Sequence, residues 1–139
     1  MSHTREEKIE AFGRFIDILD ILREKCPWDH KQTNESLRPN TIEETYELCD
    51  ALIRKDNEAT KKELGDVLLH IAFYAKIGEE NGSFDIADVC NALCEKLIYR
   101  HPHVFGTTHV DGSNEVEQNW EEKAVIKPYS KACHRPYRL

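Results

Sequence analysis

Apolar residues recur every three or four positions along most of the chain, which is the period of an α-helix with one face toward a core. In the first such stretch, residues 5–25, the repeating positions are Ile9, Phe12, Ile16, Leu19 and Leu22. Thr4 and Glu7 form a capping-box pattern at its start. Pro27 ends this helix, because the residue before a proline avoids the helical region. We therefore predict a helix from Arg5 to Lys25.

Three further helices and a short fifth are predicted from the same periodicity. Thr41 is the expected cap of the second helix, Asn57 of the third and Ser113 of the last, and Gly82 follows the end of the third. The predicted bounds are Ile42–Lys55, Asn57–Glu80, Ile86–Arg100 and Asn114–Ile126. No strand-like alternation interrupts them. The predicted fold class is all-α, a bundle of four main helices with a short fifth.

Two segments are predicted to be connections without helix: residues 26–40 and residues 101–112. The first is long for a compact domain, which hints at a function. It contains Trp28, a large apolar side chain that is costly to leave in a loop. Either Trp28 packs on the core as part of a lid, or it forms a wall of a substrate pocket.

Two acidic clusters lie on neighbouring predicted helices. The first contains Glu43, Glu44 and Glu47, and the second contains Glu63 and Asp66. Residues three or four apart share one face of a helix, and like charges at that spacing repel each other. A bound Mg²⁺ ion, which prefers oxygen ligands, would compensate this repulsion.

Each cluster also has a purely structural interpretation. Glu44 could complete a capping box with Thr41, while Glu43 and Glu47 could be a solvated face. That face would lie opposite an apolar stripe made of Ile42, Tyr46, Cys49 and Ile53. The second cluster is harder to explain in this way. Residues 64–77 are apolar nearly all round, which predicts a buried helix, and acids are rarely buried unless they are paired or bind a metal.

Length and charge limit the classes of protein. At 139 residues we expect one domain, covering residues 1–127, followed by a loosely ordered tail over residues 128–139. The net charge of −7 argues against non-specific binding to nucleic acid or to an acidic membrane. No apolar run is long enough for a membrane span, and the first residues lack the pattern of a signal peptide. A cytoplasmic location is the resulting expectation.

The cysteines and the basic residues offer fewer signals. The odd count of five cysteines favours free thiols, with Cys90 and Cys94 as small buried residues on the core face of the fourth helix. A zinc site that also uses His101 or His103 is an alternative, although no C-x-x-C spacing supports it. Lys96 and Arg100 share a helix face. They could be phosphate-binding cations, or cations favoured by the helix dipole near its C-terminus.

Several motifs together resemble the MazG-type nucleoside triphosphate pyrophosphohydrolases of the all-α NTP pyrophosphatase superfamily. They are CPWDHKQT at 26–33, the acidic pattern E-E-x-x-E at 43–47, E-x-x-D at 63–66, RHPHVF at 100–105 and NWEEK at 119–123. This resemblance implies hydrolysis between the α and β phosphates, releasing a nucleoside monophosphate and pyrophosphate. It also implies Mg²⁺ as cofactor, with Mn²⁺ as a substitute.

The resemblance assigns roles to individual residues. Metal ligands would be Glu44, Glu47, Glu63 and Asp66, and Glu43 would be a neighbouring acid that orients a water or a second ion. Lys96 and Arg100 would contact phosphates, and Trp120 would contact the nucleotide. The family resembled here usually has lysine four residues after this tryptophan, where this chain has Ala124, with Lys123 just before it. The resemblance also implies a homodimer or a dimer of dimers, and a single copy of the domain in this chain.

The mechanism expected from these residues is direct attack by water. No Ser-His-Asp or Cys-His order favours a covalent route. Glu43 or Glu47 would accept the proton of the attacking water. Two alternatives remain. The chain could be a non-catalytic helical module that binds a metal, a nucleotide or a protein partner. It could also act on a narrower substrate, such as deoxyuridine nucleotides or a phosphoribosylated metabolite.

Overall fold

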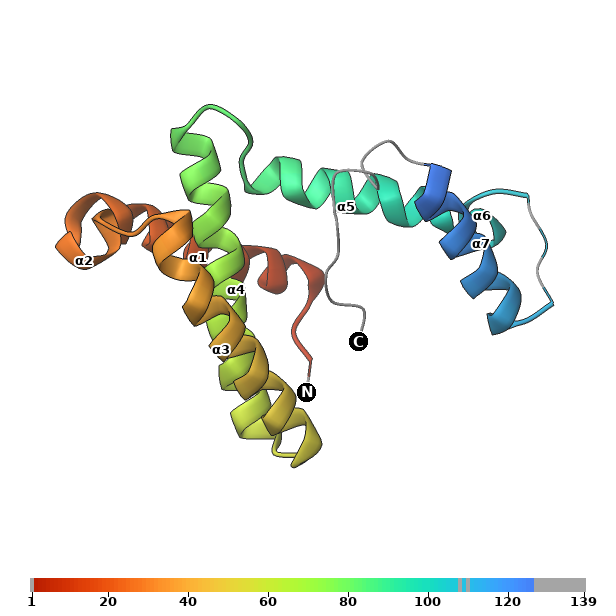
Figure 1. Ribbon diagram of the computed structural model, residues 1–139, viewed down its shortest axis with the longest axis horizontal. Helices are drawn as coiled ribbons and strands as arrows, with labels where there is room; N and C mark the ends of the chain where they lie inside the picture. The colour runs from red at the N-terminus through yellow and green to blue at the C-terminus, as the bar shows by residue number, and fades with distance from the viewer. Residues whose placement is uncertain (1, 108, 110, 127–139) are drawn as a thin grey trace. The chain divides into compact units, whose positions relative to one another are not determined.

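The computed structural model describes residues 2–107, 109 and 111–126, and within these ranges all regular secondary structure is helical (Figure 1). The all-α prediction is therefore confirmed. Two compact units divide between Ala87 and Asp88, and each is described by itself. The helices are α1 (Arg5–Lys25), α2 (Pro27–His30), α3 (Asn34–Ile53), α4 (Asn57–Glu80), α5 (Ile86–Arg100), α6 (Pro102–Phe105) and α7 (Ser113–Ile126).

Helix α1 has the predicted bounds, with Thr4 accepting a hydrogen bond from the backbone N–H of Glu7. The prediction for the next segment is wrong. Residues 26–40 contain the short helix α2 and the first turns of α3. The cap of α3 is Thr33, which exchanges hydrogen bonds with Ser36 in a capping box, so Thr41 is an interior residue.

Pro39 lies inside α3, shortly before the predicted cap Thr41. A proline inside a helix removes one backbone hydrogen bond and usually ends the helix nearby. Here the helix continues through it. Leu37 is buried on one side of the proline, and the Thr41 hydroxyl is bonded to α4 on the other. Tertiary contacts therefore hold a turn that the local sequence disfavours.

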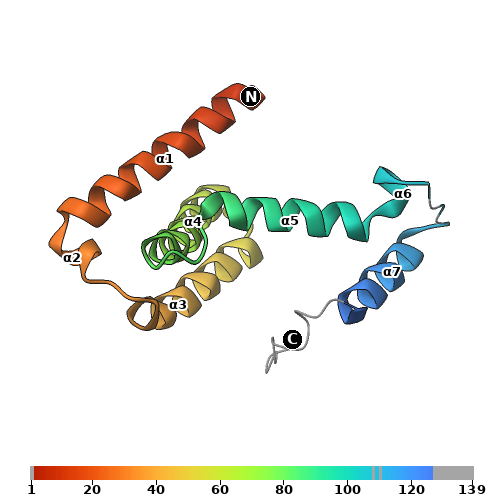
Figure 2. The same cartoon turned by 90° about the horizontal axis from the view of Figure 1, so that it is seen from above.

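Helices α3 and α4 form an antiparallel pair joined by a short turn (Figures 1 and 2). In that turn Lys55 has a positive φ of 55°. Helix α4 has the predicted bounds, although its N-cap is Asp56, whose carboxylate accepts from the backbone N–H of Ala59 at 3.1 Å. After α4, Gly82 has a φ of 71°, a conformation that suits glycine at a helix end.

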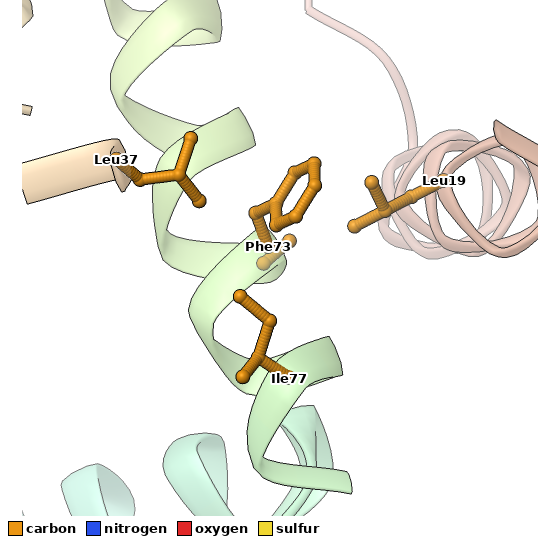
Figure 3. Packing of buried hydrophobic residues seen from close by; sticks show 5 residues of the cluster. Leu19, Leu37, Phe73 and Ile77 are labelled. Atoms are coloured by element: carbon orange, nitrogen blue, oxygen red, sulfur yellow. The ribbon is translucent and has the colours of Figure 1, made fainter. Parts of the chain in front are cut away.

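The core of the first unit lies where three helices meet. Leu19 of α1, Leu37 of α3, and Phe73 and Ile77 of α4 converge on one another (Figure 3). Only one side of α4 is buried in this way. Leu64 is 52 % exposed and Ile71 is 47 % exposed, so the prediction of a helix buried all round is wrong for the single chain. Helices α1 and α3 cover one face of α4, but not its whole circumference.

In the second unit, α5 and α7 have the predicted bounds to within one residue at the start of α7. The segment predicted as a connector contains the short helix α6. The predicted core face of α5 is exposed, and this includes Cys90 and Cys94, so their assignment as buried residues is wrong. The predicted tail over 128–139 lies outside the described residues. None of the described helices is long and apolar enough to span a membrane.

Candidate metal centre

Three carboxylates from α3 and α4 come together in the first unit. Glu44 lies in the middle of α3, and Glu63 and Asp66 lie on adjacent turns of α4. One oxygen of each residue falls within 4.8 Å of the others. The antiparallel pairing of the two helices places these acids opposite each other, so Glu44 is not the capping residue that its sequence also allowed.

The environment of these acids is costly without a cation. One carboxylate oxygen of Glu44 and one of Glu63 are buried without a hydrogen-bond partner. Burial, together with the charges of Glu47, Asp66 and Glu63, raises the pKa of Glu44 above its usual value. Buried acceptors are normally satisfied, and acids are seldom crowded in this way. A divalent cation bound by oxygen ligands fits both features.

Lys62 already places a positive charge beside this group. Its ammonium lies 3.1 Å from Glu63 Oε1 and 3.2 Å from Asp66 Oδ2. These two carboxylates raise the pKa of Lys62 above its usual value. The Lys62 side chain is mostly exposed, so it can move away when another cation binds. The sequence contains a signal for this contact, since Lys62 and Asp66 are four residues apart on one helix.

Two other acids of the first cluster have different positions. Glu47 lies one turn beyond Glu44, close enough for its charge and a side-chain hydrogen bond to raise the pKa of Glu44. Glu47 is itself exposed and does not belong to the group of three oxygens. Glu43 is also exposed. The roles of Glu43 and Glu47 in catalysis, and of Glu47 as a ligand, therefore remain predictions.

Trp28 lies on α2 and is 62 % exposed, so it does not pack on the core as a lid would. The ammonium of Lys31 lies 4.5 Å from the centre of its ring. Helix α2 is held by Arg23, whose guanidinium donates to the backbone carbonyls of Asp29, His30 and Gln32 at 2.6, 3.0 and 2.9 Å. No local signal marks Arg23, because its role depends on how the chain turns back.

The second unit contains a basic and aromatic cluster. The guanidinium of Arg100 lies 4.4 Å from the centre of the Trp120 ring, and its Nε is buried without a hydrogen-bond partner. The rings of His101 and Trp120 meet edge to face, with their centroids 5.3 Å apart. Lys96, one turn before Arg100, is partly buried. Lys123 donates to the carbonyl of Tyr99 at 2.5 Å, so its ammonium is engaged at the end of α5.

An all-α fold with a carboxylate cluster on a helical hairpin defines a class of helical proteins with a candidate cation site. Residues 32–105 match the MazG nucleotide pyrophosphohydrolase domain, and the chain belongs to this family. The nucleoside triphosphate pyrophosphohydrolase of Escherichia coli K12 is 42 % identical over 129 residues, covering 91 % of this chain and 49 % of that protein.

Another relative, from Thermotoga maritima, is named nucleoside triphosphate pyrophosphohydrolase/pyrophosphatase MazG. It is 49 % identical over 130 residues, covering 92 % of this chain and 48 % of that protein. This chain thus spans about half the length of these curated relatives. The crystal structure of a mazG-related protein from Thermotoga maritima superposes with a TM-score of 0.69 at 25 % identity, covering 81 % of this chain and 98 % of that one.

Proposed function

We propose that this protein hydrolyses nucleoside triphosphates between the α and β phosphates, releasing a nucleoside monophosphate and pyrophosphate. The proposed role is house-cleaning of the nucleotide pool. The observation that carries this proposal is the group formed by Glu44, Glu63 and Asp66, with its two buried and unpartnered oxygens. Membership of the MazG family, and the names of the relatives, support the choice of substrate.

The cofactor is proposed to be Mg²⁺, with Mn²⁺ as a substitute, held by Glu44, Glu63 and Asp66 and by Glu47 from the next turn. When bound, Mg²⁺ supplies positive charge to the triphosphate and acidifies water. Glu43 or Glu47 accepts the proton of the attacking water. The oxygen of that water bonds to the α-phosphorus, the bond from that phosphorus to the bridging oxygen breaks, and pyrophosphate leaves.

Lys96 and Arg100 are proposed to bind phosphate oxygens. The guanidinium of Arg100 is already oriented by the Trp120 ring, and its buried Nε has no hydrogen-bond partner among the described residues. Oriented cations of this kind stabilise negative charge that develops during phosphate chemistry. Trp120 and Trp28 are each proposed to contact the nucleotide, and the Trp28 ring is exposed.

The protein is also proposed to work as a homodimer, or as a dimer of dimers, in the cytoplasm. The apolar stripe of α3 supports a dimer, because Tyr46 is 71 % exposed and Ile53 is 80 % exposed in the single chain. A continuous patch of exposed apolar side chains marks an interaction surface.

The test is pyrophosphate release from a panel of ribo- and deoxynucleoside triphosphates with Mg²⁺, with and without EDTA. We expect release that EDTA abolishes and that Glu44→Gln or Asp66→Asn reduces at least a hundredfold. Glu35→Gln is the matched control, because Glu35 is an exposed acid in the first turn of the same helix.

The other outcomes separate the alternatives. Mg²⁺ binding without release of pyrophosphate from any nucleotide would indicate a binding module. Release confined to deoxyuridine nucleotides, or hydrolysis of a phosphoribosylated metabolite alone, would indicate a narrower substrate. Full activity of Glu44→Gln would exclude the proposed metal centre.

A further inference from the structure

A buried polar network joins α3 to α4 beside the carboxylate group. The hydroxyl of Thr41 lies 2.6 Å from Nδ1 of His70 and 2.5 Å from the hydroxyl of Tyr74. The same hydroxyl donates to the backbone carbonyl of Leu37 at 3.0 Å. His70 is buried, and Thr41 and Tyr74 are partly buried. These are the side-chain hydrogen bonds that link α3 to α4 among the described residues.

The chemistry of a hydroxyl fixes the roles within this network. Thr41 has one hydrogen, which it gives to Leu37, and two lone pairs that can accept. His70 Nδ1 and the Tyr74 hydroxyl are then both donors to Thr41. The Thr41 hydroxyl, Nδ1 of His70 and the Tyr74 hydroxyl each have a partner in this arrangement. A fully satisfied polar network inside a protein favours one arrangement of its elements over others.

The network lies between the apolar core and the acids. Leu37, Phe73 and Ile77 pack next to it on one side. On the other side, Glu44 is one turn beyond Thr41 on α3, and Asp66 is one turn before His70 on α4. Because the helices are antiparallel, these two steps lead in the same direction along the pair. The hydrogen-bonded contact is therefore the interhelical contact next to the carboxylate group.

The carboxylates need a contact of this kind. Glu44, Glu63 and Asp66 repel each other before a cation binds, and this repulsion pushes α3 and α4 apart at that level. Apolar packing alone tolerates small sliding movements, because it has little directional preference. Hydrogen bonds of 2.5 and 2.6 Å between the two helices are directional, and a shift along the helix axis breaks them.

We propose that Thr41, His70 and Tyr74 are positioning residues that hold the register of α3 against α4 and thereby place Glu44 beside Glu63 and Asp66 for binding a divalent cation. This inference rests on the proposed function, since it assigns the three acids to a metal. It adds residues outside the group of three carboxylates.

The test is the affinity for Mn²⁺, measured by electron paramagnetic resonance or calorimetry without nucleotide. Thr41→Val keeps the shape of the side chain and removes the hydroxyl, and Thr41→Ser keeps the hydroxyl. We expect Thr41→Val to weaken Mn²⁺ binding about tenfold, as is common when groups that orient metal ligands are removed. Thr41→Ser should bind Mn²⁺ as the parent protein does.

Thr45→Val is the matched control. Thr45 lies one turn further along α3, and its hydroxyl donates to the carbonyl of Thr41 at 2.8 Å in the same way, but it is exposed. We expect it to leave the Mn²⁺ affinity unchanged. Circular dichroism at the binding temperature shows whether each variant is folded. If Thr41→Val does not fold, Tyr74→Phe replaces it, with weaker binding again expected.

The outcomes distinguish this inference from the proposed function. If the parent protein does not bind Mn²⁺, the metal centre itself is wrong. If the parent binds Mn²⁺ and folded Thr41→Val binds it equally well, the metal centre stands and the positioning role is overturned. A variant that melts at a lower temperature but keeps its Mn²⁺ affinity also overturns it, because the network would then contribute only to stability.

Discussion

Two ionisable side chains at the α3–α4 contact, Glu44 and His70, have pKa values that are shifted by burial. Glu44 is an acid whose pKa is raised, mainly by burial, and His70 is a base whose pKa is lowered by burial in spite of the nearby charge of Asp66. Both shifts favour the uncharged form. At the residue scale, burial therefore shifts the pKa of both side chains in the direction of their neutral forms.

His70 predicts a pH dependence of stability. Its folded-state pKa lies below the ordinary value of about 6.5, so the unfolded chain takes up the proton first as the pH falls. The contribution of neutral His70 to stability is complete above the unfolded value and is lost as the pH falls through the folded value. We expect the melting temperature to fall more steeply below pH 6.5 in the parent protein than in His70→Gln.

This comparison is made in EDTA, by differential scanning calorimetry between pH 8 and pH 5. The absolute melting temperature of His70→Gln is expected to be lower throughout, because the contact with Thr41 changes. The informative quantity is the difference between the two slopes. Parallel curves over this range would show that His70 does not titrate differently in the folded state.

Within α4, two glycines have opposite surroundings. A Cβ added to Gly65 would meet nothing within 4 Å, whereas one added to Gly78 would lie 2.7 and 2.8 Å from carbons of the Phe84 ring. The space beside Gly65 is therefore open among the described residues, while the Phe84 ring occupies the space beside Gly78.

We expect Gly65→Ala to stabilise the protein by about 1 kcal/mol, the usual difference between glycine and alanine inside a helix. Gly78→Ala should not show this gain, because the new methyl group meets the Phe84 ring. In a Phe84→Ala background, Gly78→Ala should become stabilising. The free energy of unfolding is measured in urea for Gly65→Ala and for the parent, Gly78→Ala, Phe84→Ala and the double variant. If the two single changes in the free energy of unfolding at residues 78 and 84 add up to that of the double variant, the proposed clash is contradicted.

Helix α2 depends on one side chain from α1. Arg23 donates to three carbonyls at the end of α2, and it also forms an ion pair with Glu80 at 2.8 Å. Lysine at this position could keep the ion pair, but it could not reach the carbonyls together. We expect Arg23→Lys to destabilise the protein by about 2 kcal/mol, the value of one or two hydrogen bonds to a charged group.

The measurement is again urea unfolding, with the fluorescence of Trp28 in a Trp120→Phe background as a local probe. Arg14→Lys is the control, since Arg14 is an exposed residue of the same helix, and its change should stay within about 0.5 kcal/mol. Equal stabilities of the two variants would mean that α2 is held by other contacts.

For the whole molecule, the main feature is apolar surface that the single chain leaves uncovered. On α3 the exposed stripe includes Tyr46 and Ile53, and on α4 it includes Leu64, Leu68 and Ile71. We expect light scattering to give twice the mass of the chain or a multiple of it. Leu68→Asp should reduce the mass toward that of one chain, because burying an unpaired charge in an interface is costly.

Lys61→Asp is the control for this experiment, since Lys61 is an exposed and already charged residue of the same helix. Its assembly should match that of the parent protein. A parent protein with the mass of one chain at micromolar concentration would contradict the proposed homodimer, and the exposed stripes would then need another partner.

The predictable part of the fold was its periodic part. The bounds of α1, α4 and α5 follow from apolar spacing and from caps, because both act over a few residues. Helix α3 begins at Asn34 and not at the predicted Ile42, since its first turns are held by contacts with α4 that no local pattern reveals. Of the candidate site, Glu44, Glu63 and Asp66 are brought together, while Glu47 stays exposed beside them.

The sequence by itself determined that this chain is helical, where most of its helices begin and end, and which acids share a helix face. Those properties depend on neighbours within about one turn, so they can be read along the chain. Only the tertiary structure decided which acids meet across the hairpin, that Thr41 contacts His70 and Tyr74, and that Arg23 holds α2. Those contacts join residues far apart in sequence, and they depend on the register between helices, which is set by packing and directional hydrogen bonds.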